Sequence, residues 1–227
     1  MGMVMYFVPS STRYRVIRPY SCCAVVSLAV AVRVLVVSHK NQPLFFLPMA
    51  ITQGDSAGIG PEIIALAFRD HPEQMRGCFV AGDAATLRRA AQVVQRPGQP
   101  ALPVALIAQP QDAWQVPERC VPVLQLPDLT GPAPWGRISA QAGAAAAASV
   151  RWAARAALAG EIAALVTAPL HKEALHAAGV DYPGHTELLQ AEAARHAGVP
   201  LEQMPVRMML ANEELRTVLV SIHVGLR

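Results

Sequence analysis

Between Leu47 and Val166 the chain alternates short apolar runs of β type with segments of helical periodicity. The run LPMAITQ is followed by a glycine-rich turn and the helical segment PEIIALAFRD, and CFVAGD is followed by AATLRRAAQVV. Strands that alternate with helices are typical of a largely parallel sheet with helices packed on its faces. Apolar residues make up 53% of the sequence, which is enough for a sizeable core. The sequence therefore predicts an α/β fold.

Composition and charge exclude some classes of binding partner. The net charge is only +3, and no cluster of Lys and Arg is interleaved with aromatic residues, so we expect no nucleic acid partner. Small anionic molecules remain compatible with this charge. The four cysteines show no CxxC spacing, which argues against a zinc ribbon or a disulfide framework. Reduced thiols favour a cytoplasmic protein.

Residues 1–48 differ from the rest of the chain. Three arginines precede the apolar run Cys22–Val37, as in a signal peptide, but the run is shorter than the ~20 residues of a membrane span and Arg33 interrupts it. We expect no membrane-spanning segment. Three interpretations stay open for this atypical extension: a start codon assigned too early, a genuine extension packed on the surface, or a targeting segment. We base no expectation of the fold on it.

The segment Thr167–Glu187, TAPLHKEALHAAGVDYPGHTE, holds the densest group of reactive side chains. It carries a lysine, three histidines and two glutamates, although only 15% of the chain is charged. The run IAALVTA just before it reads as a buried strand, and open α/β sheets bind ligands beyond the carboxyl ends of their strands. KEALHAAG predicts a short helix, and the Pro183-Gly184 turn then delivers His185 and Thr186. We therefore expect the site here.

The glycine-rich turn before PEIIALAFRD is less informative when taken alone. Its spacing of Gly54, Gly58 and Gly60 fits neither the dinucleotide fingerprint nor a P-loop, so a tight turn is the simpler interpretation. In the helical segment AATLRRAAQVV, Arg88 and Arg89 are predicted to lie on the solvent face.

The rest of the chain predicts further elements. The proline-rich part 96–134 contains PVALI and VPVLQL, which favour edge strands or a peripheral hairpin. A long helix is predicted from a cap at Ser139 to Gly160, and ELLQAEAARHAG predicts another. VRMMLA and RTVLVSIH then predict an antiparallel hairpin that ends at His223.

Four motifs in order, GDSAGIGPE, TAPLHK, AGVDYPGHTE and RMMLANEELRTVLVSIHVGLR, resemble the signature of the 4-hydroxythreonine-4-phosphate dehydrogenase family. The resemblance runs from about Met49 to Arg227, with Asp55 and Ser56 where the family has Glu and Pro. It implies a three-layer α/β/α fold like that of isocitrate and isopropylmalate dehydrogenases, with the active site between two domains. The first domain would be 49–174 and the second 175–227, which would be incomplete. Met49 stands where family members begin.

The resemblance also implies a function. Family members use NAD or NADP to oxidise 4-phosphooxy-L-threonine, which then loses carbon dioxide to give 3-amino-2-oxopropyl phosphate in pyridoxal 5′-phosphate synthesis. It further implies a divalent metal (zinc, magnesium or cobalt), a small phosphorylated amino-acid substrate, a cytoplasmic location and a homodimer. Two alternatives stay open: a sister dehydrogenase of 4-phospho-threonate or 4-phospho-erythronate, and a catalytically silent fragment.

The resemblance assigns a role in the site to only a few residues. His185 and Thr186 match substrate-binding residues, His223 matches a metal ligand, and Lys172 is a further candidate for binding a phosphate or carboxylate. Catalytic and cofactor-binding residues are not identified. The family's other metal ligands and substrate anchors belong to motifs that would lie beyond Arg227. We therefore expect the polypeptide 1–227 to have little or no dehydrogenase activity by itself.

Overall fold

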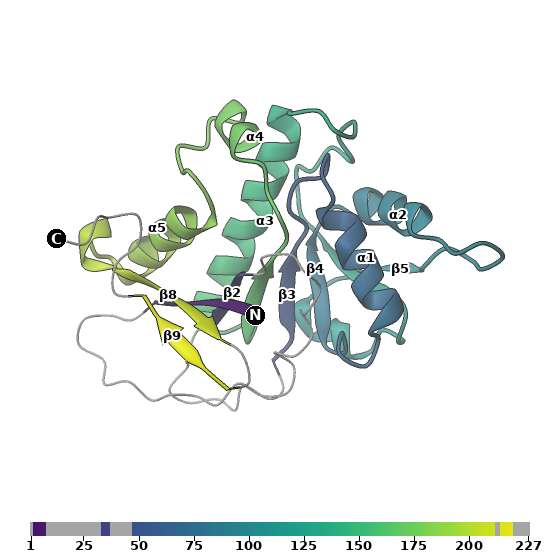
Figure 1. Cartoon of the computed structure of the whole chain (residues 1–227), viewed down its shortest axis with the longest axis horizontal. Helices are drawn as coiled ribbons and strands as arrows, with labels where there is room; N and C mark the ends of the chain where they lie inside the picture. The colour runs from purple at the N-terminus through teal and green to yellow at the C-terminus, as the bar shows by residue number, and fades with distance from the viewer. Residues whose placement is uncertain (1, 8–32, 37–46, 212–213, 220–227) are drawn as a thin grey trace.

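The computed structural model describes residues 2–7, 33–36, 47–211 and 214–219. Its centre is one sheet whose strands run in the order β5-β6-β4-β3-β7-β2-β1-β8-β9 (Figure 1). The strands are β1 Gly2–Phe7, β2 Arg33–Val36, β3 Met49–Thr52, β4 Cys78–Gly82, β5 Val104–Ile107, β6 Val121–Gln125, β7 Ala164–Thr167, β8 Val206–Ala211 and β9 Arg216–Val218. The helices are α1 Gly60–Asp70, α2 Ala84–Val93, α3 Ala140–Ala159, α4 Lys172–Ala177 and α5 His185–Ala197, with short 3₁₀ turns at Pro110–Trp114 and Leu201–Gln203.

Strands β5, β6, β4, β3 and β7 form a parallel block. Beyond β7 the direction changes, because β2 pairs antiparallel with β7 and β8 pairs antiparallel with β1 and β9. The hairpin of β8 and β9 agrees with the prediction from sequence. Strands β1 and β2 come from the region 1–48, for which sequence patterns made no assignment.

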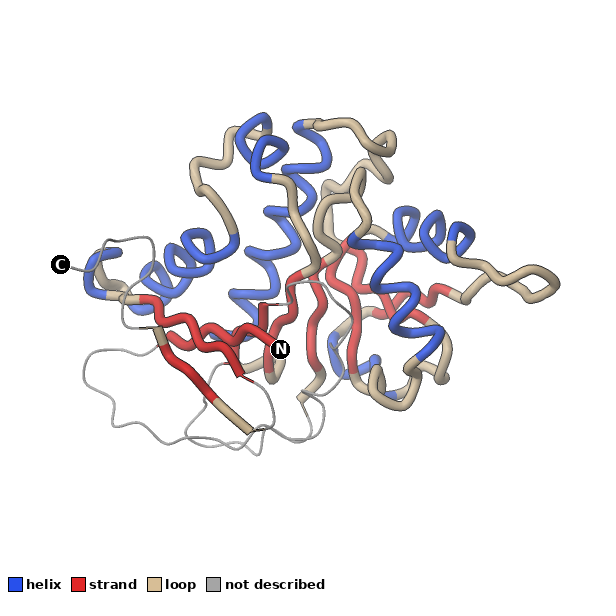
Figure 2. The backbone as a smooth tube through the Cα atoms, viewed as in Figure 1, coloured by secondary structure: helices blue, strands red, loops and turns tan. Residues whose placement is uncertain are grey.

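Two apolar clusters lie on opposite faces of the sheet. Neighbouring residues of β3 point to different faces: Ala50 packs in the cluster that holds the α3 residues Val150 and Ala154, and Ile51 packs with Ile64 of α1 and Leu87 of α2. This separation follows from the alternation of side chains along a strand. Figure 2 shows the strands through the middle of the molecule with helices on both sides. The predicted three-layer α/β fold is confirmed, whereas the division into domains at residue 174 stays a prediction.

The proline-rich part 96–134 was predicted to form edge strands or a peripheral hairpin, and the structure agrees with this only in part. Strands β5 and β6 are parallel, and β6 lies inside the sheet between β5 and β4. Val121 and Val123 of β6 are fully buried, and this burial places the strand in the interior in spite of Pro122. Of these two strands, β5 is the one at an edge of the sheet, as predicted.

Helix α3 has the predicted ends. The Ser139 side chain accepts a hydrogen bond from the Ala142 N–H at 3.1 Å, and Gly160 closes the helix in the left-handed conformation at φ 80°. Gly143 of α3 lets α4 approach closely, because the backbone of Ala174 lies where a Cβ atom on Gly143 would be. Helix α3 is thus the platform on which α4 and α5 both pack.

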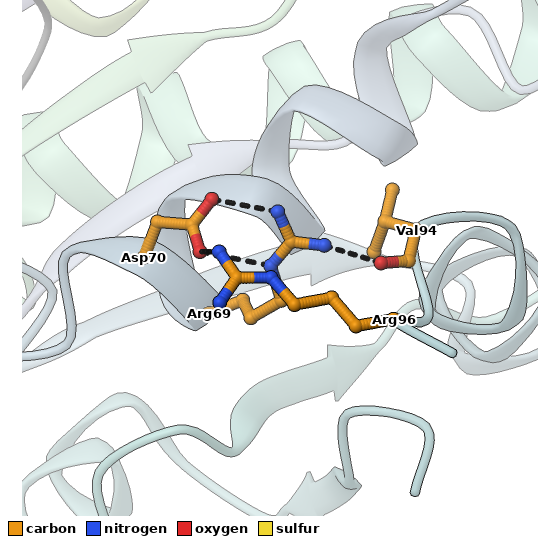
Figure 3. Close-up of polar contacts among 4 residues, drawn as sticks. All are labelled: Arg69, Asp70, Val94 and Arg96. Carbon is orange, nitrogen blue, oxygen red and sulfur yellow. Dashed lines mark hydrogen bonds and ion pairs between the residues drawn. The ribbon is translucent and has the colours of Figure 1, made fainter. Parts of the chain in front are cut away.

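A polar cluster joins the end of α1 to the loop after α2 (Figure 3). Asp70 accepts hydrogen bonds from Arg69 at 2.7 Å and from Arg96 at 2.9 Å, while Arg69 also donates to the Val94 carbonyl. The hydrogen bond from Arg69 lowers the pKa of the Asp70 carboxyl, an effect that its partial burial opposes. This cluster fixes the two helices to each other.

Candidate substrate site

Loops with polar residues follow the carboxyl ends of the parallel strands. The loop 53–59 follows β3, Asp83 follows β4, and the segment 168–171 follows β7. Because these strands are parallel neighbours, their ends meet at one edge of the sheet, where open α/β folds bind ligands.

The glycine-rich turn touches the segment after β7. The Asp55 N–H donates to the Pro169 carbonyl at 2.9 Å, and Gly54 adopts φ 70°. A Cβ atom on Gly54 would lie 2.3 Å from the Pro169 oxygen, so only glycine permits this approach. Two motifs that are distant in sequence thus share one surface.

The Asp55 side chain stabilises this turn. It is 8% exposed, and its Oδ1 accepts a hydrogen bond from the Ala57 N–H at 2.8 Å. The Asp55 carboxylate therefore has a local structural partner, as expected of an aspartate in a tight turn.

Arg89 of α2 also holds this turn, which corrects the prediction that it lies on the solvent face. Its Nη1 donates to the Ala133 carbonyl at 2.6 Å, and its Nη2 donates to the Ser56 carbonyl. The guanidinium lies 4.6 Å from the ring centroid of Trp135, within cation–π range. Two loop carbonyls that need donors draw Arg89 inward, whereas Arg88 is exposed as predicted.

A second network, which sequence reasoning missed, joins the ends of β3, β4 and β6. Gln53 Oε1 accepts from the Asp83 N–H at 2.6 Å, and Gln125 Oε1 accepts from the Ala84 N–H at 2.8 Å. Asp83 in turn caps α2 by accepting from the Thr86 N–H at 2.7 Å. The sequence did carry a signal for this network, because each of these apolar strands is followed by or ends in a polar side chain. Such a side chain needs a hydrogen-bond partner when it is buried.

Lys172 is the first residue of α4 and is exposed, as is His171 before it. Within the described residues Lys172 takes part in no ion pair. The structure therefore leaves its ammonium group accessible, three residues after Pro169, which accepts the hydrogen bond from the glycine-rich turn. A flexible lysine in this place suits a phosphate or carboxylate ligand.

His185 and Thr186 are the first two residues of α5, which starts earlier than predicted. Both are buried, with 8% exposure, and Gly184 precedes them in an extended conformation with no side-chain cap on the helix. A helix N-terminus carries partial positive charge that favours a nearby anion. The arrangement can thus present an imidazole, a hydroxyl and a helix dipole to one negatively charged group.

His223 lies outside the described residues, so its predicted role stays a prediction. Within the described residues, no three His, Cys, Asp or Glu side chains come together as a metal site. The donors described here therefore do not fit a complete metal centre. Nor does any helix of the described residues have the length and apolarity needed to cross a membrane.

A hollow of about 270 Å³ lies at the other end of the strands, beside the amino ends of β4 and β6. Its lining includes Arg76, Gly77, Trp114 and Cys120. Among the predicted site residues that the structure describes, none lines this hollow. We place the candidate site at the carboxyl ends of the parallel strands because the polar groups that follow β3, β4 and β7 are found there.

A family model, curated relatives and solved structures match this chain. The family model of the pyridoxal phosphate biosynthetic protein PdxA matches residues 74–227. A 4-hydroxythreonine-4-phosphate dehydrogenase of Trichlorobacter lovleyi is 40% identical over 181 residues, which cover 78% of this chain and 50% of the relative. A D-threonate 4-phosphate dehydrogenase of Bordetella bronchiseptica is 44% identical over 146 residues, 63% of this chain and 40% of the relative.

Among solved structures, the crystal structure of 4-hydroxythreonine-4-phosphate dehydrogenase from Klebsiella pneumoniae matches with a TM-score of 0.67 and 36% identity. The match covers 79% of this chain and 52% of that one. The chain thus spans about half the length of the curated relatives that it matches. From the family match and the shared fold, we conclude that the chain belongs to the PdxA family.

Proposed function

We propose that the protein acts as an NAD-dependent dehydrogenase of 4-phosphooxy-L-threonine. In this reaction the C3 hydroxyl loses its proton and C3 loses a hydride to the nicotinamide. The β-keto acid then releases carbon dioxide and leaves 3-amino-2-oxopropyl phosphate, a step of pyridoxal 5′-phosphate synthesis. The observation that carries the proposal is membership of the PdxA family, together with GHTE at the start of α5.

His185 and Thr186 would bind the substrate. A buried imidazole and hydroxyl at a helix N-terminus offer hydrogen-bond donors to an anionic group with little reorganisation. Lys172 would add a flexible positive charge from the start of α4. Together these groups favour a small substrate with negative charges, such as a phosphorylated amino acid.

The cofactor and the metal enter the proposal through the family. NAD or NADP supplies the hydride acceptor, and a divalent ion (zinc, magnesium or cobalt) would use His223 as one ligand. Because the described residues bring together no three metal donors, we derive no step through the ion. A homodimer and a cytoplasmic location belong to the same proposal.

A second candidate substrate is D-threonate 4-phosphate. Several relatives carry that name, including the Bordetella bronchiseptica protein at 44% identity. The two substrates differ at C2, where one has an amino group and the other a hydroxyl. Both have the phosphate that His185 and Thr186 would bind, so these residues cannot separate them.

The test is a substrate panel assayed by NADH formation. Residues 49–227 are joined to the half of the Trichlorobacter lovleyi relative that they do not match, and the hybrid is supplied with NAD and zinc or magnesium. We expect turnover with 4-phosphooxy-L-threonine that exceeds turnover with D-threonate 4-phosphate. Preference for the threonate would support the second candidate. No NADH from either, with the parent relative active, would support the silent-fragment alternative and contradict the proposal.

A further inference from the structure

Helix α5 packs on α3 through a face that carries an unusual polar residue. The buried residues of α5 include His185, Leu188, Leu189 and Glu192, which recur at the spacing of one helix face. Glu192 lies seven residues after His185, two turns along the same face and about 10.5 Å along the axis. The carboxylate of Glu192 and the proposed substrate-binding imidazole thus face the same way.

Three arginines surround the Glu192 carboxylate, which is only 2% exposed. Arg155 of α3 donates from Nε at 2.9 Å, Arg195 of α5 lies at 2.6 Å, and Arg151 of α3 lies at 3.9 Å. Burial alone would raise the pKa of this carboxyl. The hydrogen bonds and charges of Arg155 and Arg195 outweigh burial and hold the pKa below its usual range, so Glu192 is ionised at neutral pH.

A buried ion pair is a poor way to gain stability. Removing a carboxylate from water costs about as much as the pairing returns, and apolar residues of similar size often stabilise a protein equally well. In some proteins such a pair instead specifies a unique register, because its geometry is satisfied in only one arrangement. A turn of α5 by one residue would carry Glu192 about 100° away from Arg155.

We propose that Glu192 is a positioning residue for His185 and Thr186, because its ion pair with Arg155 fixes the rotation and register of α5 on α3. The inference rests on the proposed function, since it takes His185 and Thr186 as the substrate-binding residues. Glu192 itself does not touch the substrate. Its effect reaches the site through the two helical turns between it and His185.

The test uses the polypeptide 1–227 with Glu192→Gln, which keeps the shape and removes the charge. Arg155→Lys is a second variant that should disturb the fold less, because Arg155 is 64% exposed and the lysine that replaces it keeps the positive charge. Glu202→Gln makes the same chemical change on an exposed residue after α5 and serves as the control. The readouts are the NMR signals of the His185 ring, assigned with His185→Gln, the affinity for 4-phosphooxy-L-threonine, and the Tm.

At a temperature well below every Tm, we expect Glu192→Gln and Arg155→Lys to shift the His185 ring signals. Probe affinity should fall by about tenfold or more in Glu192→Gln, since small displacements of binding groups have large effects. Glu192→Asp, which keeps the charge, should recover part of that affinity, and Glu202→Gln should resemble the wild type. A lower Tm with unchanged ring signals and affinity would overturn the proposal. If the wild type binds no probe, the ring signals still decide the positioning role, and the substrate panel on the hybrid decides the proposed function separately.

Discussion

Replacement of Gly143 by alanine tests the packing of α3 against α4. Alanine is normally the better helix residue by about 1 kcal/mol, so helix propensity alone predicts a more stable protein. The structure predicts the reverse. A Cβ atom on Gly143 would lie 1.9 Å from the Ala174 carbonyl oxygen and 2.3 Å from its carbon. Both contacts are with main-chain atoms, so no change of rotamer can relieve them.

The size of the effect follows from the displacement that is needed. Ordinary contact begins at 3.4 Å, so α4 must move by 1.5 Å, the difference between 3.4 and 1.9 Å. Overpacking of a core costs about 1–3 kcal/mol, and a forced shift of backbone lies at the upper end or above. After the gain in propensity, we expect the free energy of unfolding to fall by about 2 kcal/mol. Lys172, at the start of α4, would move with the helix.

The assay is urea unfolding of the polypeptide 1–227, followed by circular dichroism. Ala144→Gly, at the exposed neighbouring position of α3, measures the difference in helix propensity between alanine and glycine at this place. If Gly143→Ala is instead more stable by the amount that Ala144→Gly loses, the close contact between α3 and α4 does not exist as described.

Other predictions concern the cap, the charge network and the glycine-rich turn. Ser139→Ala removes the N-cap of α3 and should lower the free energy of unfolding by about 1 kcal/mol, whereas an unchanged urea midpoint would argue against the cap. Glu192 has a lowered pKa in the folded state, so it stabilises the protein above its unfolded pKa of about 4.3 and this contribution is lost as the pH falls through the folded value. Urea unfolding across a pH series should therefore show the wild type and Glu192→Gln converging in acid, and a constant difference would contradict the ion pair. Arg89→Met leaves the Ser56 and Ala133 carbonyls without their donor and should speed proteolysis of the two loops, while unaltered cleavage would mean that Arg89 does not join them.

Much of the fold follows from local sequence patterns. Ser139 and Gly160 mark the ends of α3 because capping and the left-handed conformation restrict those positions to few residue types. The parallel block follows from alternation of apolar strands and helices. The interior position of β6 did not follow, because Pro122 indicates an edge strand and only the burial of Val121 and Val123 decides otherwise.

The site was predictable in part. The placement of Lys172 and of the glycine-rich turn at one edge of the sheet follows from the strands that precede them. The roles of Arg89 and Glu192 did not follow, because each depends on groups far away in sequence. Helical periodicity places Arg89 on a solvent face, and nothing local shows that two loop carbonyls come within its reach.

The central claim is that this chain supplies the residues that bind the substrate phosphate. The most direct measurement is kcat/KM of the hybrid dehydrogenase for 4-phosphooxy-L-threonine, compared between the wild-type sequence and Thr186→Val, which keeps the shape and removes the hydroxyl. A hydrogen bond to a charged group is worth about 1.5–3 kcal/mol, so kcat/KM should fall by roughly tenfold or more. Turnover of unphosphorylated 4-hydroxy-L-threonine should change little. If both substrates retain their wild-type kcat/KM, Thr186 does not bind the phosphate and the site is misplaced.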